Sequence, residues 1–93
     1  MKARLTDHAR ERAAQMGVRT RKVKDAMLMA DIVYENGPTS KYPGTWVAQF
    51  MSIAVPFFET TDPDGETVRV AVTVLWRQTE EWVRDDVNRM VTT

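Results

Sequence analysis

The first thirty residues carry apolar side chains at the spacing of an α-helix. Thr6 is a suitable N-cap, Asp7 complements the helix dipole in the first turn, and Gly17 suits the C-terminal end. A second helix start follows at Thr20. The apolar positions of the two segments are Ala9, Ala13 and Met16, then Val23, Met27 and Ala30. The pattern predicts two short helices joined by a tight turn.

After residue 30 the apolar positions indicate strands. Short β-type runs over 32–34 and 46–50 are bounded by turn residues. Longer alternating runs follow over 51–57 and 68–76, and the residues from Thr61 to Gly65 suit the turn between them. Pro56 interrupts the first long run, which indicates an edge position or a bulge. In the last run, alternation predicts one face with Val68, Val70, Val72, Val74 and Trp76, and the other with Arg69, Ala71, Thr73 and Leu75.

The C-terminal segment returns to helical spacing. Thr79 can cap a helix whose first turn holds Glu80 and Glu81. Its apolar stripe consists of Val83, Val87, Met90 and Val91. The sequence therefore predicts a single α+β domain over residues 1–93. Two N-terminal helices and a C-terminal helix would pack on a four-stranded, mainly antiparallel sheet.

The composition excludes several kinds of site and indicates where in the cell the protein acts. The chain has no cysteine, which excludes disulfides and thiolate metal sites. No stretch approaches the roughly 18 apolar residues of a membrane span, and residues 1–12 lack the apolar core of an export signal. We therefore expect a soluble cytoplasmic protein without membrane contact. Because there is one histidine and no phosphate-binding glycine loop, we expect neither a metal nor another cofactor.

The net charge of zero conceals an uneven distribution. Residues 1–30 carry eight basic against three acidic residues, a net charge of +5, and residues 31–93 carry five against ten, a net charge of −5. One interpretation is a surface that binds an anion. The other interpretation is that the two halves attract each other in the fold, or that each is a solvated face.

The only histidine, His8, lies four residues before Arg12, so the two would share a helix face. Histidine can exchange a proton near neutral pH, and a guanidinium can hold a phosphate oxygen. Together they could cleave RNA, where a base takes the 2′-hydroxyl proton and a cation stabilises the charged phosphate. The alternative is a solvated histidine, with Arg12 paired to a neighbouring acid.

Two further groups of residues could contact a polyanion. The first surrounds the start of the second helix, where basic residues oppose the helix dipole: Arg19, Arg21, Lys22 and Lys24. The second group is Thr73 and Arg77 near the end of the last strand, where Thr73 could hydrogen-bond His8 or a phosphate. The structural alternatives are a solvated basic face and a threonine that favours strand geometry.

The run from Leu5 to Arg12, followed by Met16-Gly17-Val18-Arg19-Thr20 and Val23, resembles a small prokaryotic domain family of unassigned function. Its members open on a His-x3-Arg helix and end on a strand reading Val-Thr-Val-Tyr. That family is similar to the RelE- and BrnT-like toxins, whose fold several metal-independent ribonucleases share. The resemblance spans roughly residues 5–76 and implies a helical pair on an antiparallel sheet, with candidate catalytic residues at His8, Arg12 and Thr73. This chain departs from the pattern in its neutral charge, its single histidine and Trp76 at the tyrosine position.

Two hypotheses about function follow. The leading one is a toxin-type endoribonuclease that acts on RNA or the ribosome without a metal; its substrate contacts would be Arg19, Arg21, Lys22 and Arg77. The alternative is a non-catalytic interaction module of a phage or other mobile element, which binds a host or cognate protein or forms a homodimer. A contiguous exposed apolar patch of several hundred Å² around the tryptophans would favour the alternative, and full burial of all three would remove its main support. The candidates are Trp46, Trp76 and Trp82.

Overall fold

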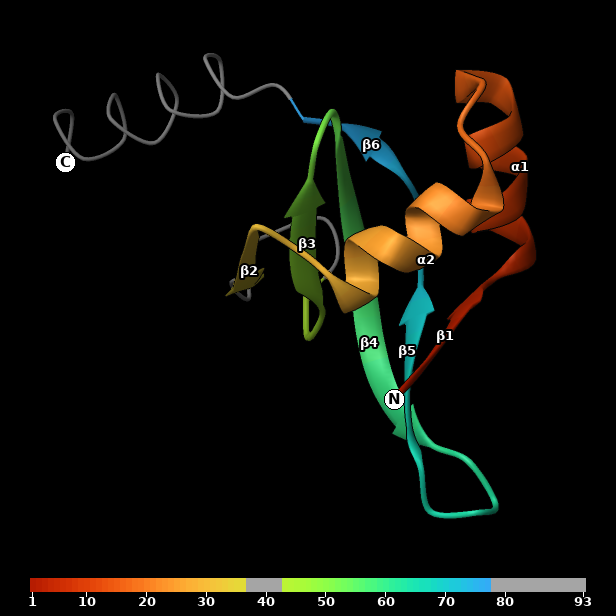
Figure 1. The fold of residues 1–93 in the computed structure, drawn as a ribbon, viewed down its shortest axis with the longest axis vertical. Coiled ribbons are helices and arrows are strands. Elements are labelled where there is room, and N and C mark those ends of the chain that lie inside the picture. The colour runs from red at the N-terminus through yellow and green to blue at the C-terminus, as the bar shows by residue number, and fades with distance from the viewer. Residues whose placement is uncertain (37–42, 78–93) are drawn as a thin grey trace, which may run out of the picture.

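A computed structural model describes residues 1–36 and 43–77, in which two helices lie on one face of a six-stranded sheet (Figure 1). The elements, in chain order, are β1 (Lys2–Leu5), α1 (Asp7–Met16), α2 (Thr20–Leu28), β2 (Ile32–Glu35), β3 (Trp46–Phe50), β4 (Ile53–Thr61), β5 (Thr67–Ala71) and β6 (Leu75–Trp76). The strand order is β1-β5-β4-β3-β2, and β6 also pairs with β4. Neighbouring strands are antiparallel except β1 and β5, which are parallel.

The predicted α+β class and the two N-terminal helices are confirmed, but the prediction of a four-stranded sheet is wrong. The described residues form six strands, because Lys2–Leu5 adds an edge strand and the last predicted strand is divided in two. The edge strand escaped prediction since its Lys2 and Arg4 are exposed cations, so only Leu5 is buried. The predicted helix after Thr79 lies outside the described residues.

Thr6 is the N-cap of α1, as predicted, and it also joins the helix to the sheet. Its Oγ1 accepts a hydrogen bond from the Ala9 backbone N–H at 3.1 Å and donates one to the Val72 carbonyl at 3.2 Å. At the other end of α1, Gly17 has a φ of 70°, which is the left-handed C-cap geometry that glycine adopts easily. The start of α1 is therefore held on the sheet at a fixed place.

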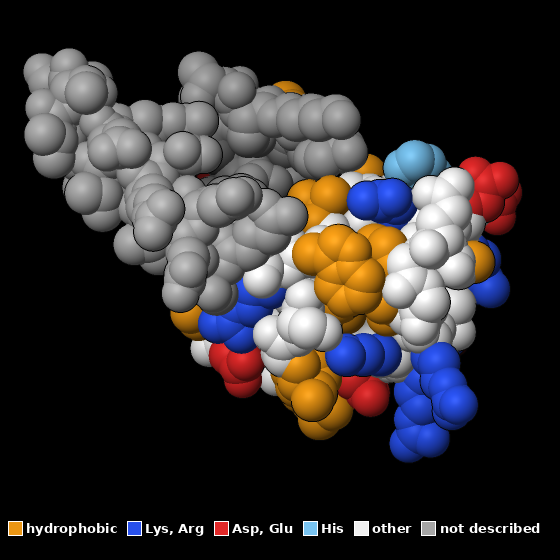
Figure 2. Space-filling model, turned by 90° about the horizontal axis from the view of Figure 1, so that it is seen from above, with side chains coloured by type: hydrophobic (Ala, Val, Ile, Leu, Met, Phe, Trp, Pro, Cys, Tyr) orange, Lys and Arg blue, Asp and Glu red, His pale blue; other side chains and the backbone are white. Residues whose placement is uncertain are grey.

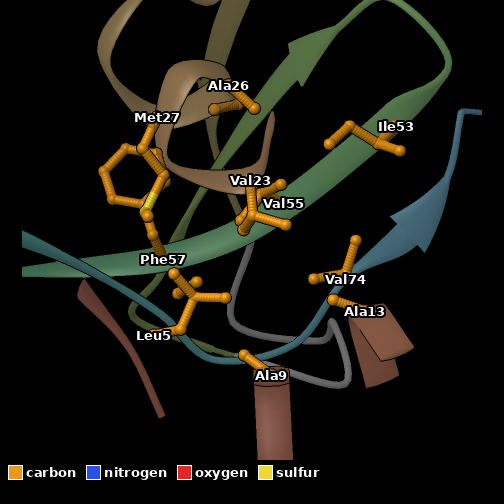
Figure 3. Packing of buried hydrophobic residues seen from close by; sticks show 12 residues of the cluster. Leu5, Ala9, Ala13, Val23, Ala26, Met27, Ile53, Val55, Phe57 and Val74 are labelled. Atoms are coloured by element: carbon orange, nitrogen blue, oxygen red, sulfur yellow. The ribbon is translucent and has the colours of Figure 1, made fainter. Parts of the chain in front are cut away.

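The hydrophobic core lies between the two helices and the face of the sheet that they cover (Figure 3). Four of its helical members, Ala9, Ala13, Val23 and Met27, come from the predicted apolar stripes, and the fifth is Ala26, which those stripes did not include. The sheet contributes Leu5, Ala48, Ile53, Val55, Phe57, Ala71 and Val74. The predicted helical faces are therefore the faces that pack.

The side chain of Arg69 has a structural role between the sheet and α2. Its Nη1 donates to the Met27 carbonyl at 2.6 Å, near the end of α2, and its guanidinium lies 4.9 Å from the centre of the Phe57 ring. A cation at a helix C-terminus is favourable because it complements the helix dipole, and the aromatic face adds a cation–π contact. Arg69 therefore ties α2 to β4 and β5.

A β-bulge separates β5 from β6. Ala71 pairs with Phe57 and Leu75 pairs with Ala54, so three residues of one strand lie opposite two residues of the other. The bulge faces Pro56, which has no N–H to donate, and the Pro56 carbonyl accepts a hydrogen bond from the Val72 N–H at 2.8 Å. Of the two positions that Pro56 predicted, the bulge is confirmed and the edge is wrong, because β4 is an inner strand.

The bulge reverses which side chains face the helices. Before it, Val68 pairs with Thr60 and Val70 with Phe58, on the sheet face away from the helices. After it, Trp76 pairs with Ile53, a member of the core under the helices. The predicted common face for Val68 through Trp76 is therefore wrong, because an extra residue shifts the alternation by one.

Candidate functional site

His8 and Arg12 lie one turn apart on α1, as predicted. The His8 side chain is exposed, and Arg12 is half-buried with its Nη1 donating to Gln15 Oε1 at 3.4 Å. Among the described residues, Arg12 has no acidic partner, and no hydrogen bond joins it to His8. Both groups are thus accessible from solvent.

Thr73 directly follows the residues that bond to the start of α1, but it is not accessible. The Thr6 N–H donates to the Ala71 carbonyl at 3.1 Å and Thr6 Oγ1 donates to the Val72 carbonyl, so the bulge is bonded to the first turn that carries His8. Thr73 itself is only 2% exposed. Within residues 1–36 and 43–77, it makes no hydrogen bond to His8. The structure therefore brings two of the three candidate catalytic residues to the surface and buries the third.

Within residues 1–36 and 43–77, the basic residues of the helical layer have no acidic partners. They are Arg10, Arg12, Arg19, Arg21, Lys22 and Lys24, and none forms an ion pair with another described residue. The acidic residues of the same layer are Asp7, Glu11 and Asp25, so six cations against three anions leave a net charge of +3. α2 lies across the sheet and α1 packs against α2 and the edge strand β1, so these charges lie on the same side of the molecule (Figure 1).

The ion pairs of the described chain lie elsewhere. Lys2 Nζ lies 2.7 Å from Asp62 Oδ2 and 3.6 Å from Glu66 Oε2, and the amine of Met1 lies 2.9 Å from Glu66 Oε1. The hydrogen bond from Lys2 lowers the pKa of Asp62, and the hydrogen bond from the Met1 amine lowers the pKa of Glu66. The basic N-terminal part of the sequence and the acidic remainder thus attract each other at the β4–β5 turn. This turn lies at the opposite end of β4 from the residues that pair with β6.

Arg77, a predicted substrate contact, is used within the fold. Its Nη1 lies 3.1 Å from Asp31 Oδ2 and donates to the Met51 carbonyl at 3.4 Å. Its side chain is 19% exposed. Arg77 therefore links the end of β6 to the start of β2 and to the β3–β4 turn, and its charge is partly neutralised.

The remaining predicted contacts surround the start of α2. Arg19 is its N-cap residue without a capping side-chain hydrogen bond, and both Arg19 and Arg21 are exposed. Lys22 is half-buried and its Nζ donates to Ser52 Oγ at 3.2 Å, which is a neutral partner. These three cations are therefore available to an anion.

An exposed tryptophan, Trp76, lies at the same end of the sheet. Its strand pairs with the start of β4, and the backbone N–H of the next residue, Arg77, donates to the Ser52 carbonyl at 2.8 Å. Trp76 is 44% exposed. Figure 2 views this end of the molecule and shows hydrophobic side chains in the middle of the face, with lysine or arginine on several sides and histidine near its rim.

The sequence contained one indication that Trp76 faces the helices, but the alternating pattern of the last strand pointed to the other face. Pro56 marked a bulge, but the alternating valines placed Trp76 on the face of Val68 and Val70. Only the register of β6 on β4 shows that Trp76 is on the helical side. Trp46 is also exposed, at 39%, whereas Trp82 lies outside the described residues.

Metal and membrane chemistry receive no support from the described residues. Within them, no three histidine, cysteine or acidic side chains form a cluster that could hold a metal ion. None of the described helices has the length and apolar character needed to cross a membrane. Comparison of the chain with protein-family models, curated proteins and solved structures finds no match.

Proposed function

We propose that this domain binds RNA on its helical layer and cleaves it without a metal, as a toxin-type endoribonuclease of the cytoplasm. The observation that carries the proposal is the set of six helical cations without an acidic partner among the described residues, beside the exposed His8. Cations without acidic partners attract a phosphate backbone and hold it through release of its counterions.

The chemistry requires few groups. The His8 imidazole takes the proton of a ribose 2′-hydroxyl, the 2′-oxygen forms a bond to phosphorus, and the bond from phosphorus to the 5′-oxygen breaks. Arg12 stabilises the charge that develops on the phosphate oxygens. The departing 5′-oxygen takes a proton from water, because the chain has no second histidine to supply it. The products are a 2′,3′-cyclic phosphate and a 5′-hydroxyl.

Incubation of purified protein with RNA, or with translating ribosomes, in the presence of a chelator tests this proposal. We expect the wild type to leave cyclic phosphate ends, His8→Ala to abolish them, and Arg12→Ala to reduce the rate roughly a hundredfold. Arg4→Ala is the control, because Arg4 is an exposed cation on the sheet face away from the helices. Equal activity of wild type and His8→Ala would end the catalytic proposal.

A second function is favoured by a separate observation, the apolar edge of the molecule. Leu28 and Met29 at the end of α2 and Ile32 and Val33 on β2 are between 41% and 57% exposed. β2 is the last strand in the order of the described sheet, and an apolar edge strand is a common site of protein association. This edge would serve a mobile-element module that binds a host protein or forms a homodimer.

Light scattering with Val33→Lys separates the homodimer from the other functions. A wild-type dimer that becomes a monomer on this substitution would support association through the β2 edge. A wild-type monomer at concentrations of about 100 µM would count against the homodimer.

A further inference from the structure

We infer that Trp76 is a stacking platform for an unpaired base, so that the domain takes its RNA single-stranded. This inference rests on the proposed binding of RNA to the helical layer and names the form of RNA that fits there. Three observations carry it: the side of the sheet on which Trp76 lies, its exposure, and the charge around it.

The bulge places Trp76 on the side of the sheet that carries the basic helices. A regular strand after Ala71 would place residue 76 on the sheet face away from α1 and α2. The extra residue opposite Pro56 instead pairs Trp76 with Ile53, whose side chain is buried beneath the helices. Bulges commonly occur next to functional sites because they re-aim a side chain. Here the side chain that is re-aimed is the largest apolar side chain of the segment.

Trp76 has a surface free to receive a ligand. Its partner on β4, Ile53, is fully buried, whereas Trp76 is 44% exposed. A tryptophan at the end of a core that remains this exposed leaves much of its apolar area in water. Stacking of a flat ring on the indole would remove that area from water.

The charge beside Trp76 favours an anionic ligand over an apolar peptide, and the flat indole face favours a nucleic acid over an acidic peptide. Lys22 Nζ and the Arg77 backbone both bond to Ser52, which immediately precedes Ile53, the residue opposite Trp76. The indole and the Lys22 ammonium therefore flank the same β3–β4 turn. An aromatic ring beside a cation on a basic surface suits a single strand, because each base offers a flat face and each nucleotide a phosphate.

The other exposed tryptophan lacks this setting. Trp46 also lies on the helical side of the sheet, since it pairs with the buried Phe57, and it is 39% exposed. Its other cross-strand partner is Glu35, an exposed carboxylate that repels phosphate. Trp46 is therefore a matched control with similar exposure and the opposite local charge.

Fluorescence anisotropy with a labelled 2′-O-methyl oligonucleotide of about ten nucleotides tests the inference. This probe has no free 2′-hydroxyl, so binding is measured without cleavage. We expect Trp76→Ala to weaken binding of the single strand roughly tenfold to a hundredfold, Trp76→Phe to retain most of it, and Trp46→Ala to change it less than twofold. Binding of the same sequence as a duplex should be unaffected by Trp76→Ala.

Trp76→Leu controls for the fold, because it keeps apolar bulk but has no aromatic face. We expect this variant to unfold at a similar urea concentration to wild type and still to lose single-strand binding. Wild-type affinity in Trp76→Leu, equal losses in Trp76→Ala and Trp46→Ala, or tighter binding of the duplex would each overturn the inference. Binding of a glutamate-rich peptide that depends on Trp76, without binding of the oligonucleotide, would also overturn it.

The two proposals fail in different ways. If His8→Ala abolishes cleavage while Trp76→Ala leaves single-strand binding unchanged, cleavage stands and base stacking fails. If Trp76→Ala loses binding but the wild type leaves no cyclic phosphate ends, base stacking stands and cleavage fails.

Discussion

At the scale of single residues, some charged side chains stabilise the fold and others are available to a ligand. The Asp62 carboxylate accepts hydrogen bonds from Lys2 Nζ and from the backbone N–H groups of Asp64 and Glu66, so it organises the β4–β5 turn. Arg69 serves the end of α2, and Arg77 serves the β3–β4 turn. The cations of α1 and α2 have no such structural acids among the described residues. Those cations are therefore the ones that remain for a ligand.

The Asp62 cluster leads to an expected loss of stability in acid. The folded state lowers the pKa values of Asp62 and Glu66, so their stabilisation is fully present above their unfolded values, about 4, and is lost as pH falls through the folded values. The pKa of Lys2 is raised, mainly by its hydrogen bond with Asp62, so its contribution is lost only above about pH 10.5.

Urea unfolding of Asp62→Asn at several pH values measures this effect. We expect the variant to be less stable than wild type at pH 7 and the difference to shrink as pH falls from 4 towards 2. Asp64→Asn, at an exposed position in the same turn, is the control. A difference that stays constant between pH 7 and pH 2 would show that the charge of Asp62 does not stabilise the fold.

At the scale of elements, the junction of β1, α1 and the bulge places the candidate site. One hydroxyl, Thr6 Oγ1, caps α1 and bonds to the first residue after β5. Its loss would free both the helix N-terminus that carries His8 and the strand segment that leads to Trp76. This junction connects the two halves of the proposed RNA surface.

We expect Thr6→Ala to lower the free energy of unfolding by about 1–2 kcal/mol, because it removes an N-cap and a hydrogen bond to the sheet. Thr6→Ser keeps the hydroxyl and should stay within about 0.5 kcal/mol of wild type. Urea denaturation measures both variants. Equal losses in Thr6→Ala and Thr6→Ser would assign the effect to packing of the methyl group and not to the hydroxyl.

At the scale of the whole molecule, the two sides of the sheet differ in charge. The helical layer carries the cations that have no acidic partner in the described part of the chain, and the opposite face of the sheet carries alternating apolar side chains with Arg4 near one edge. RNA that binds the helical layer should show an affinity that falls steeply with salt. For a single strand, the logarithmic slope is about −0.7 for each phosphate that a cation neutralises.

Replacing Arg19 and Arg21 together by glutamine should reduce that slope by about 1.4, since two phosphate contacts are lost. Arg4→Gln removes the same kind of charge from the opposite face of the sheet and should leave the slope unchanged. Titrations of the 2′-O-methyl oligonucleotide between 50 and 300 mM salt would provide the slopes. A slope that responds equally to Arg4→Gln would place the RNA on another surface.

By itself, the sequence determined the α+β class, both helices, the two caps of the first helix, and most of the apolar residues that pack beneath the helices. These features depend on local spacing and on capping chemistry, which act over a few residues. The sequence also identified His8 and Arg12 as neighbours on one helix face, since that too is local geometry. The sequence did not predict the edge strand Lys2–Leu5, because its partner strand β5 lies more than sixty residues further along the chain.

Only the tertiary structure decided which side of the sheet each late residue occupies. The register of β6 on β4 depends on one extra residue in the bulge, and an alternating run cannot reveal where its own alternation breaks. That register placed the exposed Trp76 on the helical side of the sheet, next to the β3–β4 turn to which Lys22 bonds. Long-range pairing, which no short pattern specifies, thus brought an aromatic ring and the unpaired cations to one surface.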